Sequence, residues 1–259
     1  MVKIMIDPGH GGGDPGAIGN GLQEKDLTLK ISLKIRDILY QYEDVRVNLT
    51  RTQDVSLSLK QRTDLANAWG ADYLMSIHIN AGGGNGFESF IYPGSSGVTV
   101  ANQNVIHGKI MEHLQDVRDR GRKSANFHMV RASKMPAILT ENLFIDNKSD
   151  AAKLKDDAFL DKIALGHVNG LVAAYGLKLK PSIRAASLKS YFITGGYSGQ
   201  ALQDVHTFLY ETGFWYIPTR IDSGAITFKI GAFTEGSENY NKMKDFLDRT
   251  NAYYVIRND

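Results

Sequence analysis

Two histidines and two glutamates within residues 1–141 have the chemistry of a catalytic metal site. Two imidazoles and one carboxylate form a common ligand set for catalytic zinc, and this set leaves positions open for water and substrate. His10, Glu24 and His78 would supply such a set. Glu141, if it is not a ligand, could accept a proton from water and pass it to a leaving amine. The chain has no cysteine, so any metal site must use histidine and carboxylate ligands.

The elements expected around these residues would bring them to one edge of a sheet. His10, His78 and Glu141 lie at or just past the carboxyl ends of predicted strands, and such ends line the ligand crevice of an open parallel sheet. Glu24 begins the first long predicted helix, so one turn could place it over the same crevice. The glycines of Gly9–Gly13 would let the backbone turn tightly around a ligand. A histidine after a strand is more often a hydrogen-bonded structural residue, so spacing alone leaves both interpretations open.

Strand-like and helix-like segments alternate through residues 1–180. Short apolar runs predict strands, and apolar residues recurring every three or four positions predict helices. This alternation predicts an α/β layer with a largely parallel sheet flanked by helices. The expected strands are 2–6, 45–49, 73–79, 87–92 and 137–140, and the expected helices are 24–42, 57–69, 102–117 and 156–175.

A short polar stretch near residues 180–187 interrupts this alternation. Residues 181–259 contain more than half of the aromatic residues and equal numbers of acidic and basic ones. We therefore expect a catalytic domain at 1–180, a linker at 181–187 and a second domain at 188–259.

The second domain contains a weak internal duplication. Each half reads as strand, amphipathic helix, strand, which predicts a small α+β domain with β-α-β-β-α-β order and both helices on one face. Most of its aromatic residues are expected in the core. The matching positions are Gly195 and Tyr197 with Gly231 and Phe233, then Leu202, Val205, Phe208 and Leu209 with Tyr240, Met243, Phe246 and Leu247, and Trp215-Tyr216 with Tyr253-Tyr254.

Composition excludes several classes of partner. The net charge is +2 and no basic stripe is visible, so nucleic acid is not an expected partner. No apolar run approaches membrane-spanning length, so membrane insertion is not expected either. The first residues lack the pattern of a secretory signal, which predicts a soluble product made in the cytoplasm.

The remaining titratable residues have structural interpretations. Arg51 and Arg62 are expected to make structural ion pairs rather than to bind substrate. His167, four residues from apolar neighbours on both sides, is expected in the core. His107, His113, His128 and His206 have no partner pattern and are assigned no role, and Lys3, Asp119, Arg120 and Arg122 are expected to be solvated surface residues.

Seven short motifs follow one another in order across residues 2–175. They are Ile4–Gly12, Asn20–Lys25, Leu49–Thr52, Leu59–Arg62, Ala66–Asn67, Ser76–Asn80 and Met135–Asn142. Together they resemble the zinc N-acetylmuramoyl-L-alanine amidases, the family of sporulation autolysins and several phage endolysins. The resemblance implies an α/β fold with a central mixed sheet. It also implies Zn²⁺ bound by His10, Glu24 and His78, with Glu141 as the catalytic carboxylate, and these four positions do not depart from the family pattern.

Two further resemblances concern the second domain. Thr194–Tyr197 with Gly213–Tyr216 resembles the cell-wall-binding modules of Bacillus-phage endolysins. The duplicated pattern and Ile230–Phe233 resemble SPOR peptidoglycan-binding domains. Both imply a cell-wall ligand, and the choice between the two families stays open.

These resemblances imply a peptidoglycan hydrolase that cleaves the amide bond between the lactyl group of N-acetylmuramic acid and L-alanine of the stem peptide. The expected role is that of a phage or prophage endolysin in host lysis, acting on the cell wall after release. A sporulation mother-cell autolysin with the same chemistry is the alternative. Two other classes are a metal-independent glycosidase using Glu24 and Glu141 as its carboxylate pair, and a non-catalytic wall-binding protein. The oligomeric state, the host and the stem-peptide preference are not predicted.

Overall fold

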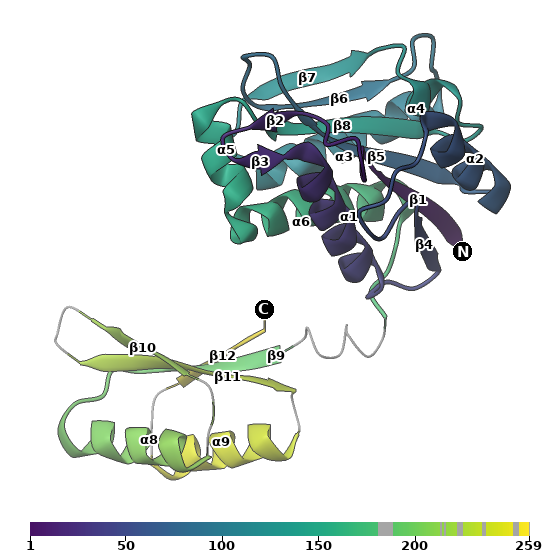
Figure 1. The fold of residues 1–259 in the computed structure, drawn as a ribbon. Coiled ribbons are helices and arrows are strands. Elements are labelled where there is room, and N and C mark those ends of the chain that lie inside the picture. Colours follow the sequence, from purple (N-terminus) through teal and green to yellow (C-terminus); the bar gives the residue numbers. More distant parts are fainter. Residues whose placement is uncertain are drawn as a thin grey trace. The chain divides into compact units, whose positions relative to one another are not determined.

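The computed structural model describes residues 1–180, 189–212, 214, 216–221, 225–234, 237–250 and 254–258. The chain forms two compact units, Met1–Leu179 and Lys180–Asp259 (Figure 1). The expected linker at 181–187 lies outside the described residues, so the domain bounds 1–180 and 188–259 stay a prediction. No helix among the described residues is long and apolar enough to cross a membrane.

A six-stranded sheet with the order β4-β1-β5-β8-β6-β7 forms the centre of the first unit (Figure 1). The first four of these strands are parallel, β6 is antiparallel to β8, and β7 is parallel to β6. This mixed, largely parallel sheet confirms the predicted fold class. The strands are β1 (Val2–Pro8), β4 (Val45–Leu49), β5 (Tyr73–Asn80), β6 (Phe87–Ile91), β7 (Asp119–Ser124) and β8 (Ala137–Phe144), and a separate ribbon consists of β2 (Ile18–Gly19) and β3 (Leu22–Gln23).

Helices cover both faces of the sheet because alternate residues of the central strands are apolar on both sides. On one face Tyr73, Met75 and Ile77 of β5 belong to the main core with residues of α1, α3 and α6. On the other face Leu74 of β5 belongs to a smaller core with residues of α2 and α4. The helices are α1 (Glu24–Leu39), α2 (Leu59–Trp69), α3 (Val98–His113), α4 (His128–Arg131), α5 (Lys148–Lys155) and α6 (Asp157–Tyr175).

Several element boundaries differ from the predicted ones for local reasons. Helix α2 begins at Leu59 because Ser58 accepts a hydrogen bond from the backbone of Gln61, whose side chain bonds back in a capping box. Strand β8 was expected to end at residue 140, but it continues to Phe144 because it is paired with β5 on one side and β6 on the other. Strand β7 and helix α5 were not predicted. Their sequences are mostly polar and lack an apolar period.

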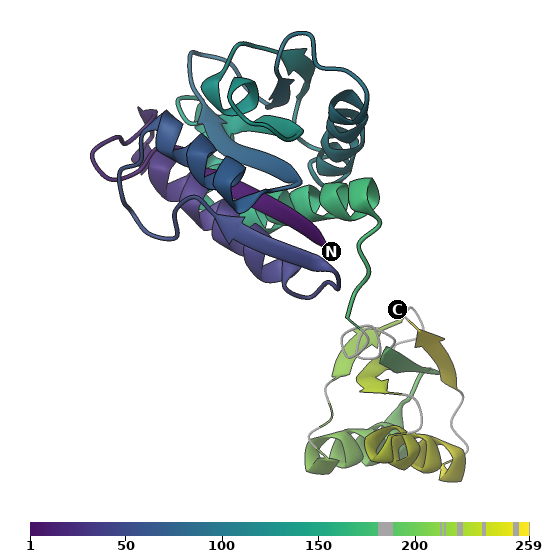
Figure 2. The same cartoon turned by 90° about the vertical axis from the view of Figure 1, so that its right-hand side faces the viewer.

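The second unit is a four-stranded antiparallel sheet with the order β10-β11-β9-β12 and two helices on one face (Figure 2). Its elements follow one another in the predicted order β-α-β-β-α-β. They are β9 (Lys189–Thr194), α8 (Gly199–Thr212), β10 (Tyr216–Arg220), β11 (Ile226–Thr234), α9 (Glu238–Arg249) and β12 (Tyr254–Asn258).

The duplicated positions of the second unit meet in its core. Val205 and Leu209 of α8 are buried with Met243 and Leu247 of α9. Phe208 and its duplicate Phe246 stack with ring centroids 3.9 Å apart. Phe192, Phe228, Phe233 and Tyr240 are also buried, in agreement with a largely structural role for the aromatic residues. Trp215 and Tyr253 of the duplication lie outside the described residues.

Candidate metal centre

Three neighbouring strands and the start of one helix bring the four predicted site residues together. His10 follows β1, His78 belongs to β5, and Glu141 of β8 is the register partner of His78. Glu24 is the first residue of α1, as predicted. His78 and Glu141 lie inside their strands rather than past the strand ends. Their side chains therefore emerge from the sheet face near its carboxyl edge.

His10, Glu24 and His78 form a compact cluster. One ligand atom from each lies within 4.8 Å of the other two. His10 Nε2 is 3.2 Å from Glu24 Oε2, and His78 Nδ1 is 3.0 Å from Glu24 Oε1. Ligand atoms of a tetrahedral zinc ion with bonds of ~2.1 Å are roughly 3.4 Å apart, so these separations suit such an ion after a small expansion. The donor set and its spacing therefore fit a zinc ion.

Backbone and side-chain hydrogen bonds hold this cluster in place. Glu24 is 4% exposed, and its two carboxylate oxygens accept the backbone N–H groups of Ile79 at 2.9 Å and Ala17 at 2.8 Å. Asp14 Oδ2 lies 2.8 Å from His10 Nδ1, so it can accept the Nδ1 proton and leave Nε2 as the ligand atom. Asp14 was not among the predicted site residues. Its position four residues after His10, within the glycine-rich loop, was the only available signal.

The electrostatics of the cluster favour a cation at its centre. The hydrogen bond with Glu24 raises the pKa of His10 to about 9. Burial opposes ionisation of Glu24, but hydrogen bonds from His10 and His78 nevertheless hold the pKa of this carboxyl well below its usual range. The buried carboxylate thus attracts positive charge. A divalent cation would supply it in place of the protons.

Two glycines are required by the close packing of the cluster. A Cβ atom at Gly9 would lie 2.4 Å from Cε1 of His78, so a side chain there would displace that ring. Gly16 has φ +65°, and its Cβ would lie 2.6 Å from Oε2 of Glu24. His10 itself has φ 60°, a left-handed conformation that costs a non-glycine residue free energy. The surrounding structure must therefore impose this conformation.

Two buried arginines hold the loop that carries His10. Arg62 forms an ion pair with Asp7 at 3.0 Å, as expected, and donates to the carbonyl oxygens of Pro8 at 2.6 Å and His10 at 2.5 Å. Arg51 makes no ion pair with a carboxylate among the described residues, contrary to expectation. It instead donates to backbone carbonyls, including Pro8 at 3.1 Å and Gly9 at 2.9 Å. Both residues therefore fix the position of the loop that carries His10.

Glu141 has the environment of a general base. Its side chain is partly buried, and its Oε2 atom is buried without a hydrogen-bond partner among the described residues. Burial raises the pKa of Glu141 to about 7. A carboxyl group with this pKa can both accept and return a proton near neutral pH. It is therefore suited to a proton-transfer role beside the cluster.

Two other histidines have structural partners outside the cluster. His167 is fully buried, and its ring nitrogens lie 2.8 Å from the carbonyl oxygen of Ile163 and 3.0 Å from the Thr140 hydroxyl, as expected for a core residue. His107 bridges Ser89 and Asp119 at 2.8 and 2.9 Å. The Ser89–His107–Asp119 arrangement resembles a hydrolytic triad, but Ser89 is fully buried and cannot reach a substrate.

A crevice of about 300 Å³ opens beside the cluster. Its lining includes His10 and His78 of the cluster and Arg62 of α2. Its remaining lining comes from Asp7, Gly9, Asp14, Leu57, Ser58 and Leu59. The cluster is thus accessible from the β1 side of His78.

Comparison with known proteins places this site in a family. The sequence model of the N-acetylmuramoyl-L-alanine amidase family matches residues 4–173. The chain is 57% identical over 179 residues to a sporulation-specific N-acetylmuramoyl-L-alanine amidase of Bacillus subtilis, covering 69% of this chain and 70% of that protein. It is 46% identical over 186 residues to the endolysin of Bacillus phage SPP1, covering 70% and 69%.

Solved structures agree with this assignment. The catalytic domain of CwlV, an N-acetylmuramoyl-L-alanine amidase from Paenibacillus polymyxa, superposes with a TM-score of 0.65 at 34% identity. The match covers 69% of this chain and all of that domain. The family match ends at residue 173, before the second unit. The chain belongs to the N-acetylmuramoyl-L-alanine amidase family.

Proposed function

We propose that the chain is a zinc-dependent amidase that cleaves the bond between the lactyl group of N-acetylmuramic acid and L-alanine of the stem peptide. One observation carries the proposal: the His10–Glu24–His78 cluster lies beside a carboxyl, Glu141, whose buried oxygen lacks a partner among the described residues. Membership of an amidase family gives the glycosidase alternative no support. The presence of all four site residues argues against a non-catalytic wall-binding protein.

Each site residue has a distinct role in this reaction. His10, Glu24 and His78 would hold the zinc ion, which when bound supplies Lewis acidity to polarise the lactyl carbonyl and acidify the attacking water. Glu141 takes a proton from that water as the new C–O bond forms. It then returns the proton to the alanine nitrogen as the C–N bond breaks. The products are a free lactyl carboxylic acid and a free amino group on L-alanine.

The proposed biological role is lysis of a bacterial cell wall by a phage or prophage endolysin. A sporulation mother-cell autolysin is the alternative, and the relatives include proteins of both kinds. Expression on prophage induction would support the first role, and expression only during sporulation would support the second.

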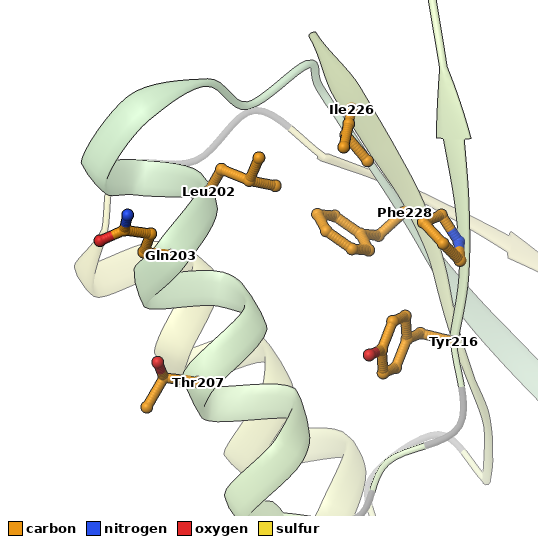
Figure 3. Close-up of a pocket in the computed structure, with 7 residues that line it drawn as sticks. Leu202, Gln203, Thr207, Tyr216, Ile226 and Phe228 are labelled. Atoms are coloured by element: carbon orange, nitrogen blue, oxygen red, sulfur yellow. The ribbon is translucent and has the colours of Figure 1, made fainter.

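We propose that the second unit binds the cell wall. It contains a cavity of about 570 Å³ between α8 and the strands. Leu202, Gln203 and Thr207 of α8 lie on one side, and the rings of Tyr216 and Phe228 lie on the other (Figure 3). Phe228 is buried, so the half-buried ring of Tyr216, which faces Gln203 and Thr207 across the cavity, is the aromatic face on which a sugar ring could stack.

Metal content and product analysis test the proposed reaction. The wild-type chain should hold about one zinc per molecule, lose activity with a chelator and regain it with zinc. His10→Ala, Glu24→Ala and His78→Ala should each lower zinc content. His113→Ala, which removes a histidine of α3 outside the cluster, should not. Digested walls should gain amino groups on L-alanine, whereas new reducing sugars would indicate a glycosidase and overturn the proposal.

A further inference from the structure

A row of charged side chains crosses four adjacent strands from the metal centre to the edge of the sheet. His78 of β5 is the register partner of Glu141 of β8, and Glu141 is the register partner of Glu88 of β6. Side chains of paired residues emerge on the same face of a sheet. Arg120 of β7 continues the row, since its Nε donates to Glu88 Oε2 at 2.8 Å. Arg120 was expected to be a solvated surface residue, and this ion pair corrects that expectation.

Glu88 fixes two cations at the end of this row. It is 5% exposed, and one of its oxygens accepts the side-chain amide of Asn80 at 2.7 Å. Its other oxygen accepts both Arg120 and Lys123 of β7. Two cations share one carboxylate, so the group carries an excess positive charge. A buried carboxylate with three donors holds both cations in defined positions.

The two cations keep surface available for a ligand. The side chain of Arg120 is 25% exposed and that of Lys123 is 39% exposed. The Arg120 guanidinium lies 4.8 Å from the centre of the Phe144 ring, which orients its plane. Its Nη2 has no hydrogen-bond partner among the described residues, and Nη1 has only a weak contact to the carbonyl oxygen of Asn85 at 3.5 Å. An oriented guanidinium with spare N–H groups suits a carboxylate.

The direction of the row decides which part of the substrate reaches these cations. The crevice beside His10 lies on the β1 side of His78, whereas Glu141 lies on the β8 side. In the proposed reaction Glu141 returns its proton to the leaving alanine nitrogen. A stem peptide that runs from Glu141 toward β6 and β7 would follow this row, with the lactyl group and its sugar on the side of the crevice.

We propose that Arg120 and Lys123 bind the free α-carboxylate of the second stem residue, the one that follows L-alanine, and so give the enzyme a preference for stem peptides in which this group is a free acid. Arg120 lies two strands from Glu141, a separation of about 9–10 Å. An extended peptide spans this distance in about three residues, and the long arginine side chain shortens it. At this distance from Glu141, the group of the stem peptide that the Arg120 side chain reaches is the free α-carboxylate of the second stem residue. This inference rests on the proposed amidase function.

The test compares two soluble muropeptides that differ only in one group. The second stem residue carries a free α-carboxylate in one and the carboxamide in the other. The wild-type enzyme should prefer the carboxylate by about 10-fold or more in kcat/KM, as expected for a charge-assisted hydrogen bond. Arg120→Met should remove most of this preference by raising KM for the carboxylate substrate. Lys123→Met should reduce it, and Arg120→Lys should restore part of it.

Arg122→Met is the matched control. Arg122 belongs to the same strand, but its guanidinium donates to Asn104 of α3 and so lies on the opposite face. This variant should keep the wild-type preference. Melting temperatures of all variants separate misfolding from lost recognition, and the ratio between the two substrates is independent of the active fraction. An equal loss on both substrates in Arg120→Met, or no preference in the wild type, overturns the inference. Failure to release alanine amino groups from either substrate would instead refute the amidase proposal.

Discussion

Protonation of His167 should make the stability of the first unit fall in mild acid. The imidazole is fully buried on α6, and burial lowers its pKa to about 4. In the unfolded chain the same group has a pKa of about 6.5. Between these values the unfolded chain binds a proton that the folded chain does not. The contribution of neutral His167 to stability is therefore complete above pH ~6.5 and is lost as the pH falls toward 4.

The size of this effect follows from the two pKa values. They differ by two to three pKa units, and at about 1.4 kcal/mol per pKa unit the full loss is about 3 kcal/mol. At pH 5 about 2 kcal/mol is already lost. His167→Gln removes the titrating group while keeping an amide that can donate and accept hydrogen bonds. The variant should be less stable than wild type at pH 8, and the gap should narrow by about 2 kcal/mol at pH 5.

Urea unfolding of both proteins at pH 8 and pH 5 measures this gap. A chelator in every sample keeps metal affinity out of the comparison, and the other titrating groups are common to both proteins. His167→Leu provides a second variant if the glutamine does not pack. A gap that stays constant between the two pH values would show that the imidazole titrates alike in the folded and unfolded chains. The assignment of His167 as a neutral core residue would then be wrong.

Two further predictions concern the buried ion pair of the first unit and the separate hydrophobic core of each unit. Arg62→Met should lower the free energy of unfolding by about 3–5 kcal/mol in urea titrations, because it leaves the buried Asp7 carboxylate without its cation. Unchanged stability would show that the ion pair between Arg62 and Asp7 does not stabilise the fold. Fragments 1–180 and 188–259 should each fold, because each unit has its own core. Fragment 1–180 should cleave soluble muropeptides but act slowly on intact walls, because it has lost the tethered second unit. Fragment 188–259 should still bind walls, and this binding should weaken little with added salt, since salt screens aromatic contacts less than ion pairs. A folded second fragment that binds no susceptible wall in a pull-down assay would refute the targeting role.

The parts of the fold that could be predicted from the sequence are those with local apolar patterns. Strands β1 and β5 are short, mostly apolar runs, β4 alternates apolar and polar residues, and α1 repeats apolar residues at helical spacing. Strand β7 reads Asp-Arg-Gly-Arg-Lys-Ser and carries no such pattern. It becomes a strand because β6 offers it backbone hydrogen bonds at the edge of the sheet. Tertiary pairing, rather than local propensity, decides this element.

The same distinction applies to the candidate site. The expectation that His10, Glu24 and His78 meet rested on their positions at strand ends and a helix start together with the resemblance to the zinc amidases, and the structure brings the three residues together. Asp14 was missed because its contact with His10 depends on how the glycine-rich loop returns on itself. The Glu88–Arg120 pair was missed because it depends on the register between β6 and β7, two parallel strands that run opposite to β8. Contacts of this kind can be recognised only once the loop conformation and the strand register are known.

The division of roles between Glu141 and the metal cluster is the central claim, and one variant tests it directly. Glu141→Gln keeps the shape of the side chain but cannot accept a proton. The variant should retain about one zinc per chain, melt near the wild-type temperature and release alanine amino groups roughly 10²–10⁴-fold more slowly. Zinc content and turnover measured on the same sample provide the answer. Loss of zinc together with activity would make Glu141 a fourth ligand, and wild-type turnover would remove it from the reaction; either result would contradict the account.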